Sequence, residues 1–413
     1  MEVRLLLIQG QNCFSLDLMG IENMKKTILL ISALLFIFCG PKQDEVERIV
    51  EDGVEVVINH LEPYKINGAT TSLTLEEEFT IDFEKDAIAE LGLTEPNAGV
   101  DVDSNGNIYL FQQPKGDNHF VFKFDSDGNY VTSFGQKGQG PGEFQYAWYM
   151  RVTSLDEIVI TAVNERKLII FDNNGEFKEA IALNPRVIEA FPLENGNYLI
   201  KKMPMSFQNK YLDYPLYLSD STLEEIKELD KFSSQNDFLV DTIEYPNPSL
   251  FQRVINEKIY VGNPRKGYEV FIYNLEGELL RKIRKEYKPV EISGEARAEI
   301  RSIIKKGVEN PNSTLYGKEV NILKYWPPFQ YLFTDDDGQL FVMTYEEGED
   351  SGHYLYDIFN PDGLFIGRVS LSNLISPIQW DIQYVVAKNN RLLSLREKGS
   401  GYKELVVYKM IWE

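Results

Sequence analysis

Polar turn clusters interrupt short runs of β-forming residues along most of the chain, from about residue 70 to the C-terminus. The clusters combine Asp or Asn with Gly, which tolerate tight turns, and the runs between them are rich in Val, Ile, Phe and Tyr. This pattern predicts antiparallel hairpins. The clusters pair off as DSNGN at 103 with DSDGN at 125, SLDE at 154 with DNNGE at 172, LENGN at 193 with SDSTL at 219, INEK at 255 with NLEGE at 274, and DDDGQ at 335 with NPDGL at 360, followed by KNNR at 388.

Each pair of turns predicts one sheet of four antiparallel strands, and the succession of pairs predicts six such sheets. Repeated four-stranded sheets of this kind are typical of β-propellers. The last sheet lacks its second turn, because the chain stops at Glu413 after the strand ELVVYKMIWE. We expect the segment 74–83 to complete it and remove its exposed edge. The predicted fold class is therefore all-β, a six-bladed β-propeller of four-stranded antiparallel blades over residues 70–413.

The most specific motif lies in two pieces, FGQKGQGPGEFQ at 134–145 and NERKLIIFDNNGEF at 164–177. Its glycines and proline suit a tight crossing between blades. The two pieces resemble the repeat of NHL-type propellers, with a G..G.GPGEF run followed by N.R(I/L)..F and a Gly turn. The segment 325–342 resembles the start of a late blade in exported bacterial six-bladed propeller proteins. These resemblances imply an exported bacterial propeller.

A long connection at 288–328 separates the fourth and fifth predicted blades. Residues 293–307 predict a helix in it, with Ser293 as N-cap and Gly307 as the stop. Ala296, Ile300, Ile303 and Ile304 are expected on one face of that helix. The helix would either pack on the rim of the propeller or cover one mouth of its channel.

The N-terminal part contains a candidate export signal. Residues 24–39 read MKKTILLISALLFIFC, two lysines and an apolar run that end at Cys39. This run resembles a bacterial lipoprotein signal, which implies lipidation of Cys39 and a place in the periplasm or at the outer membrane, with an uncleaved signal as the alternative. We expect residues 1–23 to be a start-site extension and 40–69 a linker or arm.

Charge limits the possible partners. The chain carries 64 acidic and 42 basic residues, a net charge of -22. Such a charge repels polyphosphate and anionic membranes, so nucleic acid is not an expected partner and membrane contact would come through the lipid anchor.

The sequence offers no pattern that supports catalysis. Of its three histidines, His60 precedes the repeats, while His119 and His353 fall in loops, and no nucleophile or phosphate-binding motif occurs. Asp101, Asp103 and Asn105 begin like a calcium loop, but the twelfth position is Gln112, so a hairpin turn explains them. We therefore expect no catalytic residue, no bound metal and no cofactor.

Charged and aromatic residues gather in the predicted links between the second and third strands of the blades. On the face where propellers usually bind ligands, these links could bind an anionic ligand, with arginines suited to bidentate contact. The candidate ligand-binding residues are Lys115, His119, Arg166, Arg265, Tyr268, His353 and Arg396.

These observations predict a non-catalytic binding module for a peptide, protein or saccharide. One alternative is a metal-assisted hydrolase similar to propeller lactonases, which bind a divalent metal in the central channel. The other is a structural subunit of an envelope complex, with an apolar patch beside the 288–328 insertion. The starts of the inner strands hold Arg151 and Arg253, which oppose a divalent metal, beside the candidate ligands Asn97, Glu189, Gln252, Gln330 and Asp381.

Overall fold

The computed structural model describes residues 6–9, 12–15, 46–66, 68, 71–93, 99–113, 119–349, 352–372 and 385–413. The chain divides into two units, residues 1–45 and 46–413. In the first unit the described residues form one hairpin, β1 (Leu6–Gln9) with β2 (Asn12–Ser15). The candidate signal at 24–39, with Cys39, lies outside the described residues.

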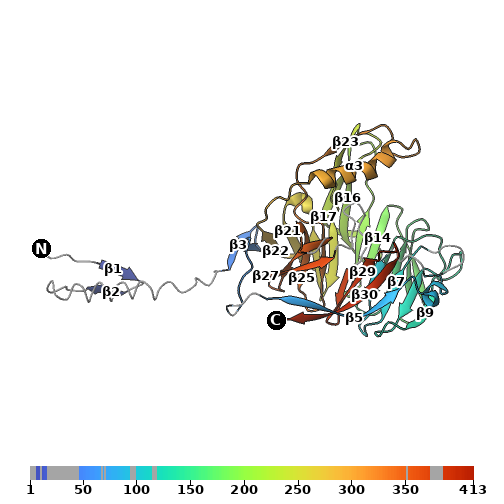
Figure 1. Ribbon diagram of the computed structural model, residues 1–413, viewed down its shortest axis with the longest axis horizontal. Coiled ribbons are helices and arrows are strands. Elements are labelled where there is room, and N and C mark those ends of the chain that lie inside the picture. The colour runs from blue at the N-terminus through green and yellow to red at the C-terminus, as the bar shows by residue number, and fades with distance from the viewer. Residues whose placement is uncertain are drawn as a thin grey trace. The chain divides into compact units, whose positions relative to one another are not determined.

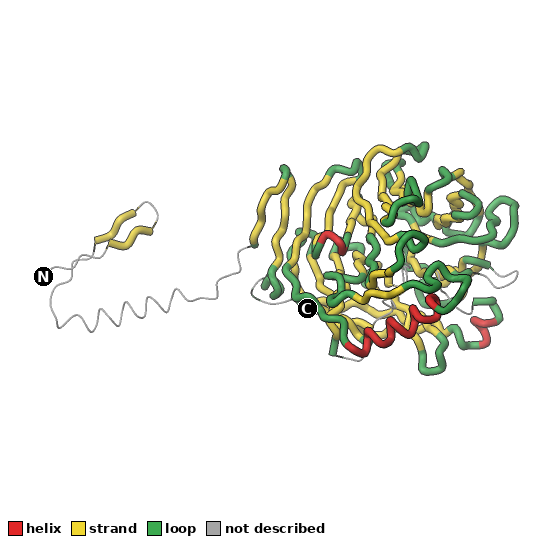
Figure 2. Tube along the Cα trace, turned by 90° about the horizontal axis from the view of Figure 1, so that it is seen from above, coloured by secondary structure: helices red, strands yellow, loops and turns green. Residues whose placement is uncertain are grey.

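The second unit is a six-bladed propeller, which confirms the predicted fold class. Figures 1 and 2 show successive strand-built sheets with few helices among them. The first three blades are β6 (Gly99–Val102), β7 (Ile108–Phe111), β8 (Val121–Phe124) and β9 (Tyr130–Phe134); β10 (Tyr149–Val152), β11 (Ile158–Ala162), β12 (Lys167–Phe171) and β13 (Phe177–Ala182); and β14 (Val187–Pro192), β15 (Tyr198–Lys202), β16 (Tyr211–Ser219) and β17 (Glu225–Gln235).

The remaining three blades follow the same antiparallel order. They contain β19 (Phe251–Ile255), β20 (Lys258–Gly262), β21 (Glu269–Asn274) and β22 (Leu279–Lys285); β24 (Tyr331–Thr334), β25 (Leu340–Glu347), β26 (His353–Phe359) and β27 (Phe365–Ser372); and β28 (Val385–Lys388), β29 (Arg391–Glu397) and β30 (Lys403–Trp412) with β5 (Leu73–Asp82). Because the strands alternate in direction, the paired turns all lie on one side of the ring, the turn face. The links between second and third strands and the crossings between blades lie on the other side, the loop face.

Ring closure takes the predicted form. β5 pairs antiparallel with β30, from Leu73 opposite Trp412 to Asp82 opposite Glu404. Leu73 and Ile81 are buried in the main hydrophobic core. A strand from the N-terminal side thus completes the last blade and removes its free edge.

Residues 46–59, which we expected to be part of a linker or arm, form two strands that widen blade four. β4 (Val54–Asn59) pairs in parallel with β22, and β3 (Glu47–Glu51) pairs antiparallel with β4. The turn between them places Asp52 and Gly53 at positive φ. Blade four therefore has six strands in place of the predicted four.

The Gly-Pro-Gly crossing between blades one and two follows from local chemistry. The side chain of Glu143 turns back and accepts a 2.8 Å hydrogen bond from the Gly140 N–H. Phe144 is fully buried against Phe120, with ring centroids 4.1 Å apart. Gly142 has φ +74, a conformation that favours glycine. The crossing thus covers the core of blade one.

The insertion before blade five forms a small structure of its own on the loop face. β18 (Thr242–Tyr245) pairs in parallel with β23 (Glu319–Ile322), and α3 (Gly294–Val308) contacts β23. Ser293 caps α3 as predicted, whereas Gly307 lies inside the helix and the C-cap is Glu309. Ile300 and Ile304 are buried, but Ile303 is exposed at the edge of the expected apolar face.

The other helical segments are short, α2 (Asp86–Ala89) and the 3-10 turn η1 (Pro264–Lys266). Among the described residues, no helix is both long and apolar enough to cross a membrane.

Candidate functional site

The predicted loop-face residues lie on separate blades. Lys115 lies outside the described residues. Arg166 is exposed at φ +53 in the turn between β11 and β12. His119 is partly buried, with Nδ1 3.1 Å from Ser133 Oγ and Nε2 2.8 Å from the Gln136 amide nitrogen. Burial lowers the pKa of His119 and favours its neutral form.

The other charged candidates already have protein partners. The guanidinium of Arg265 donates to Asn247 Oδ1. Arg396 pairs with Glu404 at 2.8 Å and with Glu77 at 3.2 Å. His353 Nδ1 lies 3.4 Å from Ser370 Oγ. No contact between any two of these candidates is seen in the part of the chain that the structure describes, so they do not form one compact site.

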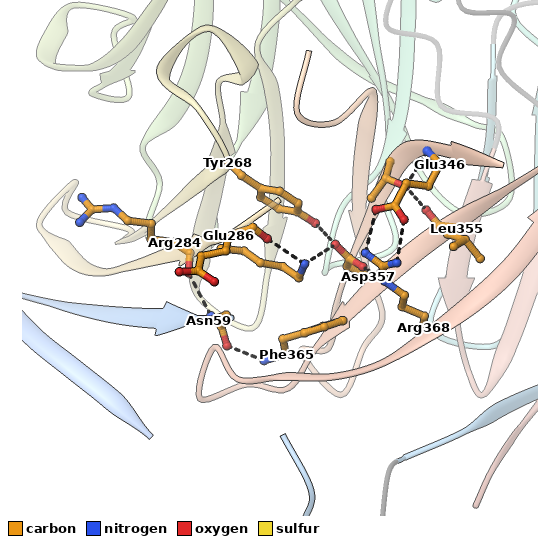
Figure 3. Close-up of polar contacts among 11 residues, drawn as sticks. Asn59, Tyr268, Arg284, Glu286, Glu346, Leu355, Asp357, Phe365 and Arg368 are labelled. Atoms are coloured by element: carbon orange, nitrogen blue, oxygen red, sulfur yellow. Dashed lines mark hydrogen bonds and ion pairs between the residues drawn. The ribbon is translucent and has the colours of Figure 1, made fainter. Parts of the chain in front are cut away.

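Tyr268 lies in the core and cannot stack on a ligand at a loop end. It is 3% exposed, and its hydroxyl donates a 2.6 Å hydrogen bond to Asp357 Oδ2. The same carboxylate accepts a 2.6 Å bond from Arg368 and lies 3.5 Å from the ammonium of Lys285. Figure 3 shows these side chains converging on Asp357. Tyr268 thus belongs to a buried polar network between blades four and five.

The inner strands surround a cavity of about 120 Å³ along the axis of the ring. Every blade contributes to its lining. At roughly 30 Å³ per water molecule, this volume suits about four waters or one small polar group. The charged residues in its wall are Asp101, Arg151, Glu189, Lys201, Arg253 and Lys388. Four cations thus face two carboxylates in a protein whose net charge is -22.

Asp101 is held by backbone groups of two blades. Its carboxylate accepts hydrogen bonds from the N–H of Val102 at 2.9 Å and of Val152 at 2.8 Å. Burial raises the pKa of Asp101, against the effect of the Val152 hydrogen bond and the nearby Arg151. Lys388 donates a 3.0 Å bond to the Val102 carbonyl and so holds its ammonium beside Asp101.

Glu189 connects three other wall residues. Its carboxylate lies 3.7 Å from Arg151 and 3.4 Å from Lys201, and it accepts a 2.8 Å hydrogen bond from the Gln252 amide. These contacts join blades two, three and four at the cavity. Because one carboxylate serves two cations, the group remains positively charged.

Arg253 has hydrogen-bonding capacity that its surroundings do not use. Nη1 donates a 2.6 Å bond to the Gln252 carbonyl, and the guanidinium lies 4.8 Å from the centre of the Tyr331 ring. Nε and Nη2 are buried and donate to no acceptor among the described residues, and Gln252 Oε1 accepts no hydrogen bond there. Nε and Nη2 lie along one edge of the guanidinium, a spacing that matches the two oxygens of a carboxylate.

The described wall residues do not fit a divalent metal. Three or more metal-ligating side chains do not gather anywhere in the described ranges. Arg151 and Lys201 already neutralise Glu189, and Arg253 borders the same cavity. Asn97 and Asp381, two ligands considered from the sequence, lie outside the described residues.

The sequence reading named Arg151, Glu189, Gln252 and Arg253 at the inner strands, and all four line the cavity. It missed the cavity roles of Asp101, Lys201 and Lys388. One signal was available for Lys201, a lysine in the otherwise apolar strand β15. A charge there has to be paired in the interior.

Comparisons with known proteins agree with the fold. The model of the family DUF5128, described as a 6-bladed beta-propeller, matches residues 101–252. A DUF4221 protein of Bacteroides vulgatus has a similar structure, with a TM-score of 0.52 at 12% identity, over 83% of this chain and 99% of that one. At this identity the likeness shows the fold alone.

Two further solved structures match less well. A Bacteroides fragilis protein described as exported gives a TM-score of 0.48 at 14% identity, over 86% of this chain and 99% of that one. A gluconolactonase of Xanthomonas campestris gives 0.39 at 11% identity, over 82% of this chain and 100% of that one. No curated protein matches the chain.

Proposed function

We propose that this protein is an exported, lipid-anchored binding module that holds a small anionic group of its ligand in the central cavity of the propeller, without chemistry of its own. The ligand would be a saccharide or peptide that bears a carboxylate, because the cavity has room for one such group and little more. The candidate signal and Cys39 support export and anchoring.

The observation that carries this proposal is the unused edge of Arg253. A buried polar group without a partner costs about 1–3 kcal/mol, and more when it is charged. An anion that accepts from Nε and Nη2 would remove this cost and gain two charge-assisted hydrogen bonds. The excess of cations in the wall would stabilise the same anion.

The loop face is a weaker candidate for the same ligand. Arg265 and Arg396 already have acceptors there, and Arg166 is exposed to solvent, where ionic contacts contribute little. A lactonase function is disfavoured because the cations of the cavity wall would repel a dication.

Isothermal titration calorimetry at low salt with galacturonate, succinate and acetate tests the proposal, with uncharged galactose as the control ligand. We expect at least one of the acids to bind and galactose not to bind. Arg253→Gln should weaken binding roughly 10- to 100-fold, the effect of losing a charged hydrogen-bond partner. Arg166→Gln should leave it unchanged. Loss of binding in Arg166→Gln but not in Arg253→Gln, or no binding of any acid, would refute the cavity assignment.

A further inference from the structure

The outer hairpin of blade three extends beyond its inner strands on the loop face. β16 and β17 stay paired to Tyr211 and Gln235, whereas β15 ends at Lys202, opposite the middle of β16. In Figure 1, α3 and β23 lie beyond the ends of β16 and β17. The insertion has its own core of Ile292, Ile300, Ile304 and Ile322. Trp326 stacks on Tyr345 of blade five, with ring centroids 4.5 Å apart, and so fixes the insertion to the ring.

Three neighbouring loops at this place expose large apolar side chains. Phe207 lies between β15 and β16, Phe238 and Leu239 lie between β17 and β18, and Tyr316 lies between α3 and β23. Their exposed fractions are 54%, 76%, 44% and 56%. We call these four residues the blade-three patch.

The patch is held in place by a buried side chain. Asn236 is 1% exposed, and its amide donates to the carbonyls of Phe207 at 2.8 Å and Asn209 at 3.0 Å. Its Oδ1 accepts from the Phe238 N–H at 3.2 Å. Lys318 donates to the Val240 carbonyl and ties the loop of Tyr316 to the same place. The apolar side chains are therefore exposed on a fixed framework, which lowers the entropy cost of binding.

The charges around the patch indicate what would cover it. Asp241, Glu244 and Glu319 are exposed beside it, and Lys210 is the one exposed cation in the described loops that carry Phe207 and Phe238. A second copy of this chain, with its own charge of -22, would be repelled. A surface with apolar anchors and a basic rim would be attracted.

We infer that the blade-three patch is a docking surface for a partner protein that presents aromatic or aliphatic side chains flanked by Lys or Arg. Phe207 and Phe238 would contact the apolar anchors, and Asp241 and Glu319 would pair with the basic flank. This surface is separate from the central cavity, so the inference does not depend on the proposed ligand.

A phage library of random dodecapeptides, panned on the wild-type protein, provides the probe. We expect enriched peptides that combine an aromatic or aliphatic residue with at least two basic ones. Synthetic copies should bind Phe238→Ser at least 10-fold more weakly, measured by fluorescence anisotropy, and Asp241→Lys should also weaken them. The matched control is Leu155→Ser, since Leu155 is 72% exposed but lies in a turn of the turn face. This control should bind the peptides like the wild type.

Several results would overturn the inference. These are enrichment of acidic peptides or of none, or equal binding by the wild type and Phe238→Ser. A wild-type dimer in light scattering that Phe238→Ser abolishes would assign the patch to a second copy. Flotation with vesicles of phosphatidylcholine and phosphatidylglycerol that needs Phe238 would assign it to lipid.

Discussion

The hydroxyl of Tyr268 donates a 2.6 Å hydrogen bond to the carboxylate of Asp357, and this bond joins blades four and five. Both residues are buried, and the side chain of Lys285, 3.5 Å from the same carboxylate, has no exposed surface. The carboxylate therefore compensates a buried ammonium and a buried hydroxyl together.

Asp357→Asn should destabilise the fold by about 3–5 kcal/mol, because it leaves the Lys285 charge buried without its counterion. Urea denaturation followed by tryptophan fluorescence measures this. Glu346→Gln is the matched control, since Glu346 pairs with Arg368 but is one-third exposed, and its loss should cost less than about 1 kcal/mol. Equal effects of the two substitutions would show that Asp357 does not compensate Lys285.

Ring closure by β5 predicts a difference between two truncated proteins. A chain that begins at residue 63 lacks β3 and β4, and one that begins at residue 85 also lacks β5. The second should be less stable by about 3 kcal/mol or more, because it loses buried Leu73 and Ile81 and exposes the edge of β30. Thermal unfolding compares the two. Equal midpoints would contradict closure by β5.

The local chemistry of the turns made most of this fold predictable, because each Asp-Gly or Asn-Gly cluster acts on its own neighbours. The six-stranded form of blade four was not predictable. The segment VEVVIN reads as a strand, but its parallel partner β22 lies more than two hundred residues away in the sequence, and no local signal names it.

The candidate site was harder to predict, for two reasons. Tyr268 starts a strand, and at such a position the sequence does not separate a rim residue from a core residue. Gln252 and Arg253 are adjacent on β19 and would face opposite sides of an ordinary sheet, yet both line the cavity. β19 has no neighbouring strand on its inner side, so both side-chain directions border the channel.

Stability should also depend on Asp335. Burial raises the pKa of this 3% exposed carboxyl to about 7, although its Oδ1 accepts a 2.7 Å bond from the Gln339 N–H. Its ordinary pKa is 3.8, so from about pH 4 to 7 the native state binds more protons than the unfolded state. The free energy of unfolding should therefore fall as the pH rises through this window, by roughly 4 kcal/mol at most.

Urea denaturation at several pH values between 4.5 and 8 measures this dependence. Asp335→Asn should flatten the fall, because asparagine does not titrate. If the wild type and the variant showed the same pH profile, Asp335 would titrate normally in the folded protein.

Anchoring through Cys39 predicts a labelling result. Bacteria that express the full chain with an alkyne-tagged fatty acid should label the wild type but not Cys39→Ser, because the thiol is the acceptor of the lipid. Membrane fractionation should recover the wild type with the envelope and the variant as soluble protein. An unlabelled wild type in the soluble fraction would exclude the anchor.

The central claim is that Arg253 binds an anionic group in the channel, and a crystal structure with the tightest-binding acid tests it most directly. The account predicts electron density for a carboxylate in the central cavity, with its oxygens within about 3.2 Å of Nε and Nη2 of Arg253. A carboxylate bound at the loop-face residues Arg166 or Arg265, with the cavity holding only water, would contradict it.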